Sequence, residues 1–286
     1  MIPPNQNDRI DAHQHFWRYN PAQHAWMTEE MAAIRKNFLP PDLKLLLDRV
    51  GFTGCVVVQV RQSLEETRWL LELAGRYDFI LGVVGWVDLR SPELPDQMRE
   101  FAGREKLVGV RHIVQDEPDD EFMLGEDFQR GIRLLAEFDL AYDVLIYPRQ
   151  LPAALRLLEK FPSQLFVLDH IAKPPIAEGA LEPWATHIRR LAQAPNLYCK
   201  LSGMVTEARW QAWREDDFRP YLDIVFEAFG PARLMIGSDW PVCTLAASYE
   251  GAMGIVMNYI KPLSTAEQEG ILGANCVRFY KLTVRA

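Results

Sequence analysis

The sequence predicts an α/β protein with a (β/α)8 barrel, also called a TIM barrel. Short apolar runs rich in Val, Ile and Leu recur along the chain, and each is followed by a longer amphipathic stretch. This alternation predicts parallel strands joined by helices. We identify eight such runs, the number of strands that closes the barrel, and the length of 286 residues is near the ~250 typical of the class.

The predicted strands, in chain order, are Arg9–His15, Gly54–Val60, Ile80–Val87, Val108–Ile113, Ala141–Ile146, Leu165–His170, Leu197–Leu201 and Arg233–Ser238. No stretch rich in Pro, Gly and Ser divides the chain. Since two small domains would normally leave such a linker, we expect a single domain over residues 1–286.

Two of the segments between strands carry a signal for the start of a helix. Ser63 can cap a helix, and Glu66 follows it three residues later, which is the spacing of a capping box. Ser264 and Glu267 repeat this spacing before the last predicted helix. Both pairs therefore predict where a helix begins.

Two connections between strands are unusually long. Phe16–Pro40 follows the first strand and contains Trp17, Tyr19, Trp26 and Phe38, and Ile171–Trp184 follows the sixth strand and contains three prolines. Both leave the C-terminal ends of strands, the rim on which barrels build their active sites. We therefore expect both segments to form walls or lids of a pocket at that rim.

Composition and charge exclude several classes of protein. The net charge is −8, and Lys and Arg are scattered, which disfavours a surface for nucleic acid or an anionic membrane. The start of the chain lacks a basic segment followed by an apolar run, and no later stretch approaches ~20 apolar residues. The four cysteines are far apart, which favours reduced core thiols and a cytoplasmic location. The acidic segment Asp116–Glu121 is expected to be a solvated turn.

Polar residues stand at the C-terminal ends of several predicted strands, where interior positions should be apolar. The first strand ends with His13, Gln14 and His15, and the alternation of side chains along a strand puts both histidines on one face. Taken alone, this HxH pattern is as well explained by exposed or internally bonded histidines. Further polar residues at strand ends are Arg111, His112, Asp169, His170, Lys173, Lys200, Ser202, Ser238 and Asp239. Four of the six histidines lie at such ends, which predicts a functional cluster.

A cluster of this composition can support two kinds of hydrolytic chemistry. Neutral imidazoles and a carboxylate can bind a divalent metal ion that acidifies a water molecule. Alternatively, the carboxylate can act as the general base while histidines, Lys and Arg bind a carbonyl oxygen that gains charge. The residues alone leave both alternatives open.

Five motifs of the chain resemble the amidohydrolase superfamily, and in particular its sugar-lactonase branch, which includes L-fuconolactonases and L-rhamnonolactonases. The motifs are DAHQHFW at the first strand, GVRH at the fourth, VLDHIAKP at the sixth, CKLSG at the seventh and RLMIGSDWPV at the eighth. The resemblance extends from about Asp11 to Leu282, and NCVRFYKL near the end resembles the closing helix of the family.

The resemblance implies a (β/α)8 hydrolase in which Asp239 activates a water molecule. His13, His15 and His170 match the histidines that the family carries on strands one and six. The fifth predicted strand has no histidine, and the fourth supplies no bridging lysine or glutamate, so a site with two metal ions is not expected. Members of the lactonase branch work with one divalent ion or none. Any single ion, zinc or manganese, would be bound by some of His13, His15, His170 and Asp239.

The remaining polar and aromatic residues are assigned by their positions. We expect Asp239, His170, His112 and Lys200 to be catalytic, with His112 favoured over Arg111 because Arg111 can point away from the barrel. A sugar ring offers apolar C–H faces and hydroxyl groups, which suits aromatic rings with a few polar partners. The expected substrate-binding residues are His13, His15, Trp26, Gln59, Trp86, Arg111, Lys173 and Trp240. For each tryptophan, packing in the core is an equally good interpretation.

The leading hypothesis is a hydrolase that opens lactones of sugar acids, such as L-fucono- or L-rhamnonolactone, without a required cofactor or with one divalent ion. A metal-dependent amidohydrolase or decarboxylase acting on a small carboxylated substrate is the alternative, and a non-catalytic sugar-binding barrel is a third. The expected partner is a small-molecule lactone, not nucleic acid or a membrane. The chain is compatible with a monomer or a homo-oligomer.

Overall fold

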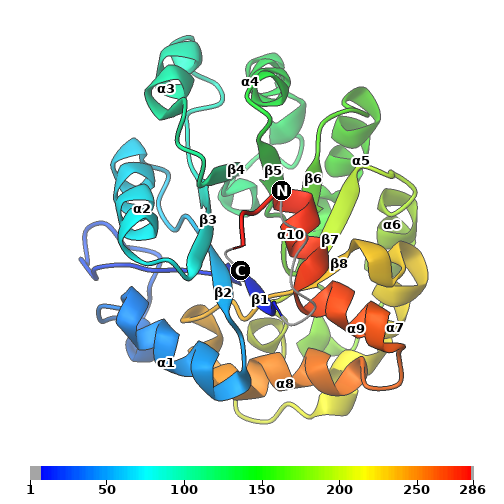
Figure 1. The fold of residues 1–286 in the computed structure, drawn as a ribbon. Coiled ribbons are helices and arrows are strands. Elements are labelled where there is room, and N and C mark those ends of the chain that lie inside the picture. The colour runs from blue at the N-terminus through cyan, green and yellow to red at the C-terminus, as the bar shows by residue number, and fades with distance from the viewer. Residues whose placement is uncertain (1–7, 285–286) are drawn as a thin grey trace.

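The computed structural model describes residues 8–284 and shows eight parallel strands in chain order around a barrel (Figure 1). The strands are β1 (Ile10–Gln14), β2 (Gly54–Val58), β3 (Ile80–Gly85), β4 (Leu107–His112), β5 (Ala141–Val144), β6 (Phe166–Leu168), β7 (Leu197–Leu201) and β8 (Leu234–Ile236). Each overlaps a predicted strand, so the predicted fold class is confirmed. Residues 1–7, which belong to the start that lacks a basic segment followed by an apolar run, lie outside the described residues.

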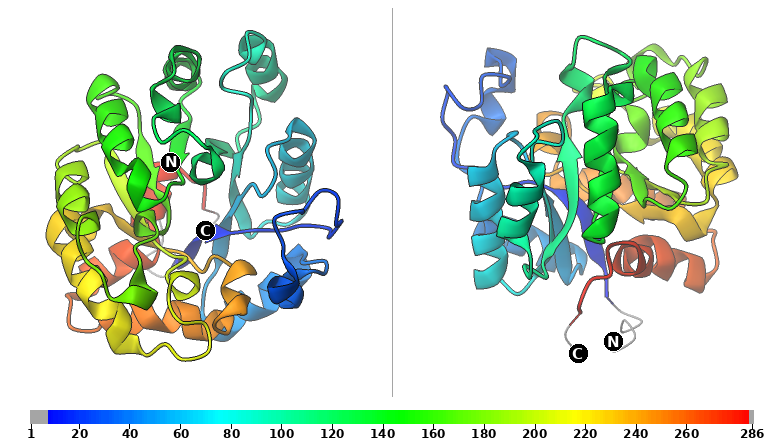
Figure 2. Two further views of the ribbon diagram at one scale, coloured as in Figure 1. Left: turned by 180° about the vertical axis from the view of Figure 1, so that it is seen from behind. Right: turned by 90° about the horizontal axis from the view of Figure 1, so that it is seen from above.

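The helices lie in a ring outside the strands, except for the last helix, as both views in Figure 2 show. They are α1 (Pro40–Val50), α2 (Leu64–Arg76), α3 (Leu94–Phe101), α4 (Glu126–Glu137), α5 (Leu151–Lys160), α6 (Trp184–Leu191), α7 (Glu215–Phe229), α8 (Tyr249–Tyr259), α9 (Thr265–Glu269) and α10 (Asn275–Tyr280). None of the helices among residues 8–284 combines the length and the apolar character that crossing a membrane requires.

One of the two predicted capping boxes is present. Ser264 and Glu267 bond to each other's backbone N–H groups at the start of α9, which confirms that prediction. Ser63 precedes α2, but its side chain makes no capping hydrogen bond, so the prediction of a capping box there is wrong. Glu66 instead accepts hydrogen bonds from the backbone N–H groups of Val60 and Arg61, at 2.9 and 2.6 Å. The short loop after β2 competes successfully for this carboxylate.

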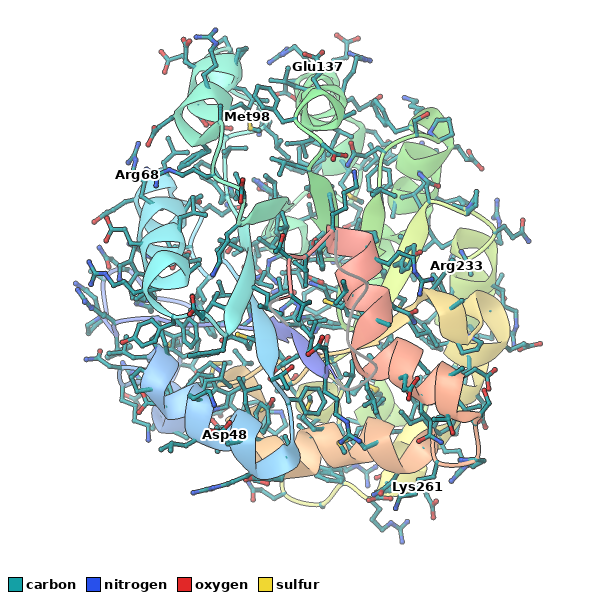
Figure 3. All side chains as sticks on the ribbon, in the orientation of Figure 1. Asp48, Arg68, Met98, Glu137, Arg233 and Lys261 are labelled. Carbon is teal, nitrogen blue, oxygen red and sulfur yellow. The ribbon has the colours of Figure 1, made fainter. Side chains whose placement is uncertain are left out.

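Two apolar layers hold the fold together. One fills the space between strands and helices, and the other lies inside the barrel, where Ile10, Val56 and Val167 meet α10. Helix α10 therefore plugs the end of the barrel opposite the C-terminal rim; in Figure 1 it lies in front of the strands, near the centre of the ring. Charged side chains such as Asp48, Glu137 and Lys261 point outward (Figure 3). The four cysteines are buried and free, as predicted.

The seam between β1 and β8 is closed by the residues that follow β8. The backbone N–H of Asp239 donates to the carbonyl of His13 at 2.8 Å, and the N–H of His15 donates to the carbonyl of Trp240 at 2.7 Å. The carboxylate of Asp11 accepts hydrogen bonds from the N–H and hydroxyl of Ser238, at 2.9 and 2.6 Å. The closing seam thus fixes the backbone around Asp239.

Candidate active site

A cavity of about 410 Å³ opens at the C-terminal ends of the strands. Trp26 and Met31 line it, so Phe16–Pro40 forms part of its wall as predicted; from the second long segment only Lys173 reaches it. The residues around it are His15, Trp26, Met31, Val60, Arg111, Ile113, Gln115, Asp116, Leu145, Tyr147, His170, Lys173, Thr206, Glu207, Trp210, Asp239, Val242 and Leu245. The pocket therefore combines apolar walls with several charged groups.

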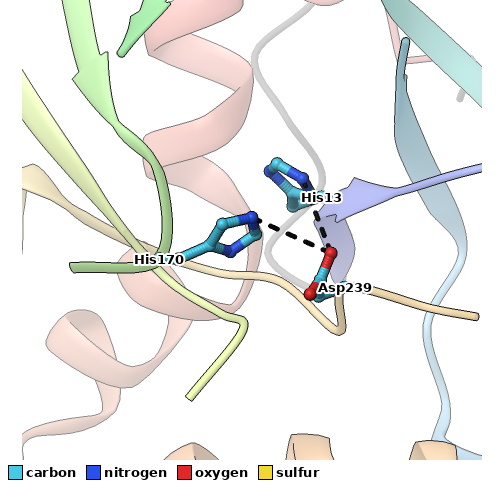
Figure 4. A group of neighbouring side chains, drawn as sticks. All are labelled: His13, His170 and Asp239. Carbon is cyan, nitrogen blue, oxygen red and sulfur yellow. Dashed lines mark ion pairs between the residues drawn. The ribbon is translucent and has the colours of Figure 1, made fainter. Parts of the chain in front are cut away.

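Asp239 lies at the base of this cavity among three histidines. Its Oδ1 is 3.2 Å from Nε2 of His15. It is also 3.8 Å from Nε2 of both His13 and His170, and Figure 4 shows these two contacts as dashed lines. The alternation along β1 does bring both of its histidines to the same carboxylate. The register between β1 and β2 shifts after Asp11, because β1 carries one extra residue there.

Hydrogen bonding fixes the proton on His15. Its Nδ1 lies 2.8 Å from the carbonyl oxygen of Val58, which can only accept, so Nδ1 carries a proton. Nε2 then faces Asp239 either as a lone pair or, with a second proton, as a donor. Asp239 and His15 therefore hold one proton between them whenever they are hydrogen-bonded.

Left-handed backbone aims both Asp239 and His170 into the cavity. Asp239 has φ of 57°, and the four residues His170 to Lys173 all have φ between 47° and 59°. Such conformations cost roughly 1–2 kcal/mol for each residue with a side chain, and strain of this kind concentrates at functional sites. Gly203 makes room for the turn, since a Cβ there would lie 2.4 Å from Nδ1 of His170. Ser202 holds the ring by a 2.9 Å contact between Oγ and Nδ1.

The charge states suit a base that lies beside two neutral histidines, His13 and His170. Burial lowers the pKa of His13 and His170 well below 6.5, and the charge of Lys200 lowers that of His13 further. Burial acts to raise the pKa of Asp239, but His170, His15 and Lys173 outweigh it and lower that pKa. At neutral pH, Asp239 is therefore ionised.

A chain of buried charges lies beneath the cavity. Arg111 donates from Nη1 to Oδ2 of Asp169 at 3.1 Å, and Nζ of Lys200 is 3.1 Å from Oδ1 of Asp169. Lys200 also contacts Asp143 at 2.5 Å, and the hydroxyl of Tyr280 donates to the two oxygens of Asp143, at 2.9 and 2.8 Å. Arg111 and Lys200 were expected at the site from the sequence, whereas Asp143 and Tyr280 were not. Because two buried carboxylates are paired with two cations, the net charge of this group of linked side chains is close to zero.

The expected directions of Arg111 and His112 are reversed in the structure. Arg111 points into the barrel and lines the cavity, whereas His112 bonds to Glu117 at 2.7 Å and stacks on Phe122 outside it. The register between β3 and β4 shifts by one residue near Gly109, which exchanges the faces of the residues that follow. The hydrogen bond with His112 holds the side chain of Glu117 in place. The expectation that Asp116–Glu121 is only a solvated turn is therefore wrong.

Five other predicted site residues do not line the cavity. Lys200 and His13 are fully buried, and neither side chain lines the cavity in which we expected them to act. Gln59 is also buried, and its side-chain amide donates to the carbonyl of Arg111. Trp240 packs against Phe38, and Trp86 stands outside the lining. Large apolar rings at strand ends serve packing here, which sequence position alone does not reveal.

Six polar or aromatic residues that line the cavity were missed, namely Gln115, Asp116, Tyr147, Thr206, Glu207 and Trp210. Tyr147, Glu207 and Trp210 lie in the loops that follow strands, where no strand pattern marks them, and Gln115 follows β4. A signal was available in the length of the segment after β7, which carries Glu207 and Trp210 close together.

His13, His170 and Asp239 form a group that could hold one divalent ion, with donor atoms within 4.8 Å of one another. Two neutral imidazoles and an ionised carboxylate are a donor set that zinc and manganese accept. The residues therefore fit a single ion. Nη1 of Arg111 lies 3.3 Å from Nε2 of His13, so the guanidinium and an ion would compete for that nitrogen.

Comparison with known proteins gives consistent relatives. The chain is 42% identical over 285 residues to an L-fucono-1,5-lactonase of Burkholderia multivorans, with 96% of each chain covered. It is 39% identical over 281 residues to an L-fucono-1,5-lactonase of Burkholderia ambifaria, again with 96% of each covered. A crystal structure of an amidohydrolase from Burkholderia multivorans with bound zinc is 43% identical, with a TM-score of 0.93, over 96% of this chain and all of that one.

The match to a family model covers nearly all of the described residues. The model of the amidohydrolase family matches residues 10–282, from the first residue of β1 to just beyond α10. Together with relatives at about 40% identity over almost the whole length, this match shows the family. The chain belongs to the amidohydrolase family.

Proposed function

We propose that this protein hydrolyses lactones of sugar acids, with L-fuconolactone as the first candidate. The observation that carries the proposal is the position of Asp239, an ionised carboxylate at the base of a cavity, with three histidines around it and Arg111 beside them. The two relatives named L-fucono-1,5-lactonase support the choice of substrate class. The aromatic and polar lining suits a sugar ring.

In the proposed reaction, Asp239 takes a proton from a water molecule as the water oxygen attacks the lactone carbonyl carbon. Negative charge then develops on the carbonyl oxygen, where Arg111 and His170, both on the cavity wall, can stabilise it. The bond between the carbonyl carbon and the ring oxygen breaks, and the ring oxygen takes the proton. Asp239 returns that proton to the ring oxygen, and Nε2 of His15, 3.2 Å away, orients the carboxylate.

Direct attack by water is favoured over a covalent intermediate. The described residues that line the cavity include no serine or cysteine. Ser202 contacts His170 and is 2% exposed, but its hydroxyl lies outside the cavity lining. Thr206 lines the cavity, but its hydroxyl donates to the carbonyl of Gly203. An alkoxide leaving group also needs less assistance than an amine, so one acid/base residue is sufficient.

A single divalent ion is compatible with this proposal. His13, His170 and Asp239 would hold it, and when bound it would polarise the carbonyl oxygen or acidify water. The zinc in the relative from Burkholderia multivorans supports zinc as the first ion to test.

The test is a panel of sugar-acid lactones assayed by proton release at neutral pH, with spontaneous hydrolysis subtracted. Hydrolysis of L-fuconolactone by the purified protein, lost in Asp239→Asn, would support the proposal. The alternative, a metal-dependent amidohydrolase or decarboxylase, would instead release ammonia or carbon dioxide from a small carboxylated substrate. Binding of lactones with no turnover would leave the third hypothesis, a sugar-binding barrel.

A further inference from the structure

Lys173 and Glu207 form a charged pair on the wall of the cavity. Nζ of Lys173 is 3.4 Å from Oε1 of Glu207, and the two side chains remain 16% and 19% exposed. Both line the cavity, and they come from different segments, Lys173 after β6 and Glu207 after β7. The pair therefore presents a cation and a carboxylate side by side to whatever fills the cavity.

The pair is not saturated by its own contact. Charge-assisted hydrogen bonds usually span about 2.7–2.9 Å, and this contact is longer. An ammonium has three donors and a carboxylate about four acceptor sites, so one long contact leaves most of them for other partners. The ammonium also lies 5.4 Å from the centre of the Tyr147 ring.

The surroundings of the pair are those of a binding wall. Tyr147 and Trp210 line the cavity as well, and the indole N–H of Trp210 donates to the carbonyl of Thr206, which precedes Glu207. Lys173 is the last of the four left-handed residues after β6, so its direction is set by strained backbone. An apolar ring face beside a donor and an acceptor matches a hydroxylated ring.

We infer that Lys173 and Glu207 determine specificity by binding two neighbouring hydroxyl groups of the substrate. The ammonium donates to the oxygen of one hydroxyl, and the carboxylate accepts the O–H of the next. This inference rests on the proposed lactone hydrolysis and adds which part of the substrate is recognised. The favoured substrates are lactones that carry a vicinal diol on the side of the ring that faces Lys173 and Glu207.

Polar groups that are built to bind a hydroxyl discriminate strongly against an analogue that lacks it, because they lose their partner on binding. An apolar wall gives weaker discrimination. The proposed diol site therefore predicts that kcat/KM is much higher for a lactone than for its deoxy analogue. This difference should depend on Glu207 and Lys173.

The experiment compares kcat/KM for L-fuconolactone with kcat/KM for its monodeoxy analogues, each lacking one hydroxyl. In the wild type, we expect at least one analogue with a hydroxyl missing from the diol to lose about 100-fold or more. In Glu207→Gln and in Lys173→Met, the preference for the parent lactone should largely disappear. The ratio of kcat/KM for the parent lactone to kcat/KM for the analogue should fall to about tenfold or less. Glu121→Gln, which breaks an exposed ion pair with Arg156, is the matched control and should keep the wild-type ratio.

A ratio that is unchanged in both cavity variants would overturn the inference, even if their overall rates fall. The wild-type rate on L-fuconolactone reports separately on the proposed function, so the two failures are distinguishable. The comparison of the parent lactone with its analogues can be made on the wild type alone. If removal of no single hydroxyl lowers kcat/KM of the wild type, that result also overturns the inference. Thermal unfolding of each variant identifies any loss caused by misfolding.

Discussion

The guanidinium of Arg111 and the imidazole of His13 meet beneath the cavity, with Nη1 3.3 Å from Nε2. Asp169 and the carbonyl of Gln59 hold the guanidinium in this position. A permanent positive charge thus stands beside a histidine that could also bind a metal ion.

Arg111 and His112 should differ sharply when they are replaced. Arg111→Met removes a cation from the cavity wall and leaves Asp169 short of a partner, so kcat should fall by about 100-fold or more. His112→Gln should change kcat by less than about threefold, since this ring lies outside the cavity against Phe122. Steady-state kinetics of the two variants, with unfolding curves as the control, measures the contrast. Equal losses would contradict the assignment.

Replacing Asp239 by Asn should lower kcat by about 100-fold or more, because the base is lost. The change keeps the size of the side chain, so circular dichroism and the unfolding midpoint should remain close to those of the wild type. Asp48→Asn, at an exposed carboxylate of α1, is the matched control. Near-normal turnover by Asp239→Asn, or a trapped acyl group on Ser202, would exclude the proposed mechanism.

The protein should bind at most one divalent ion per chain. The three clustered donors suffice for one ion, and β5 contains no histidine that could serve a second one. Elemental analysis after dialysis against zinc should give one equivalent or less, and Asp239→Asn should weaken zinc binding in calorimetry. Two equivalents held in the active site would refute this expectation.

Activity should not decline as the pH falls through 6.5, the ordinary pKa of a histidine. The reaction needs Asp239 ionised and His13 and His170 neutral, and the lowered pKa values of all three keep these states as the pH falls through 6.5. Activity should be lost only in more acidic solution, when these groups gain protons. NMR titration of the imidazole C–H signals checks the cause, and a midpoint near 6.5 for His13 or His170 would count against it.

Gly203→Ala should impair the site more than its small size suggests. The new Cβ would lie 2.4 Å from Nδ1 of His170, and φ at this position is +61°. We expect a loss of about 2–4 kcal/mol of stability from the overlap and the left-handed backbone, together with a lower kcat. Gly179→Ala has a similar φ of +69° but open space around it, so it separates the two effects. Identical losses in both variants would show that the overlap with His170 has no effect.

The fold and the centre of the site were predictable from the sequence because they depend on regular patterns. Strand runs of Val, Ile and Leu located all eight strands, and the spacing of His13 and His15 placed both beside Asp239. These predictions need only the period of a strand and the rule that polar groups gather at the strand ends.

The remaining residues depend on local departures from that regularity. One extra residue in β4 turns Arg111 inward and His112 outward, and no sequence pattern marks this shift except Gly109. Glu207 and Trp210 reach the cavity through the path of a loop, which periodicity does not describe. Asp143 was missed for a different reason, since its partners Lys200 and Tyr280 are 57 and 137 residues away in the chain.

The contact between Tyr280 and Asp143 has a consequence for how the protein is made on the ribosome. The segments that carry Asp143, Asp169 and Lys200 are all synthesised well before Tyr280. These charges are therefore present in the nascent chain before the hydroxyl of Tyr280, the partner of Asp143, exists. The interior below the active site can reach its final arrangement only after α10 has emerged and docked. Synthesis that stops before Tyr280 should therefore yield a chain with all eight strands but an incomplete support beneath Arg111 and His13.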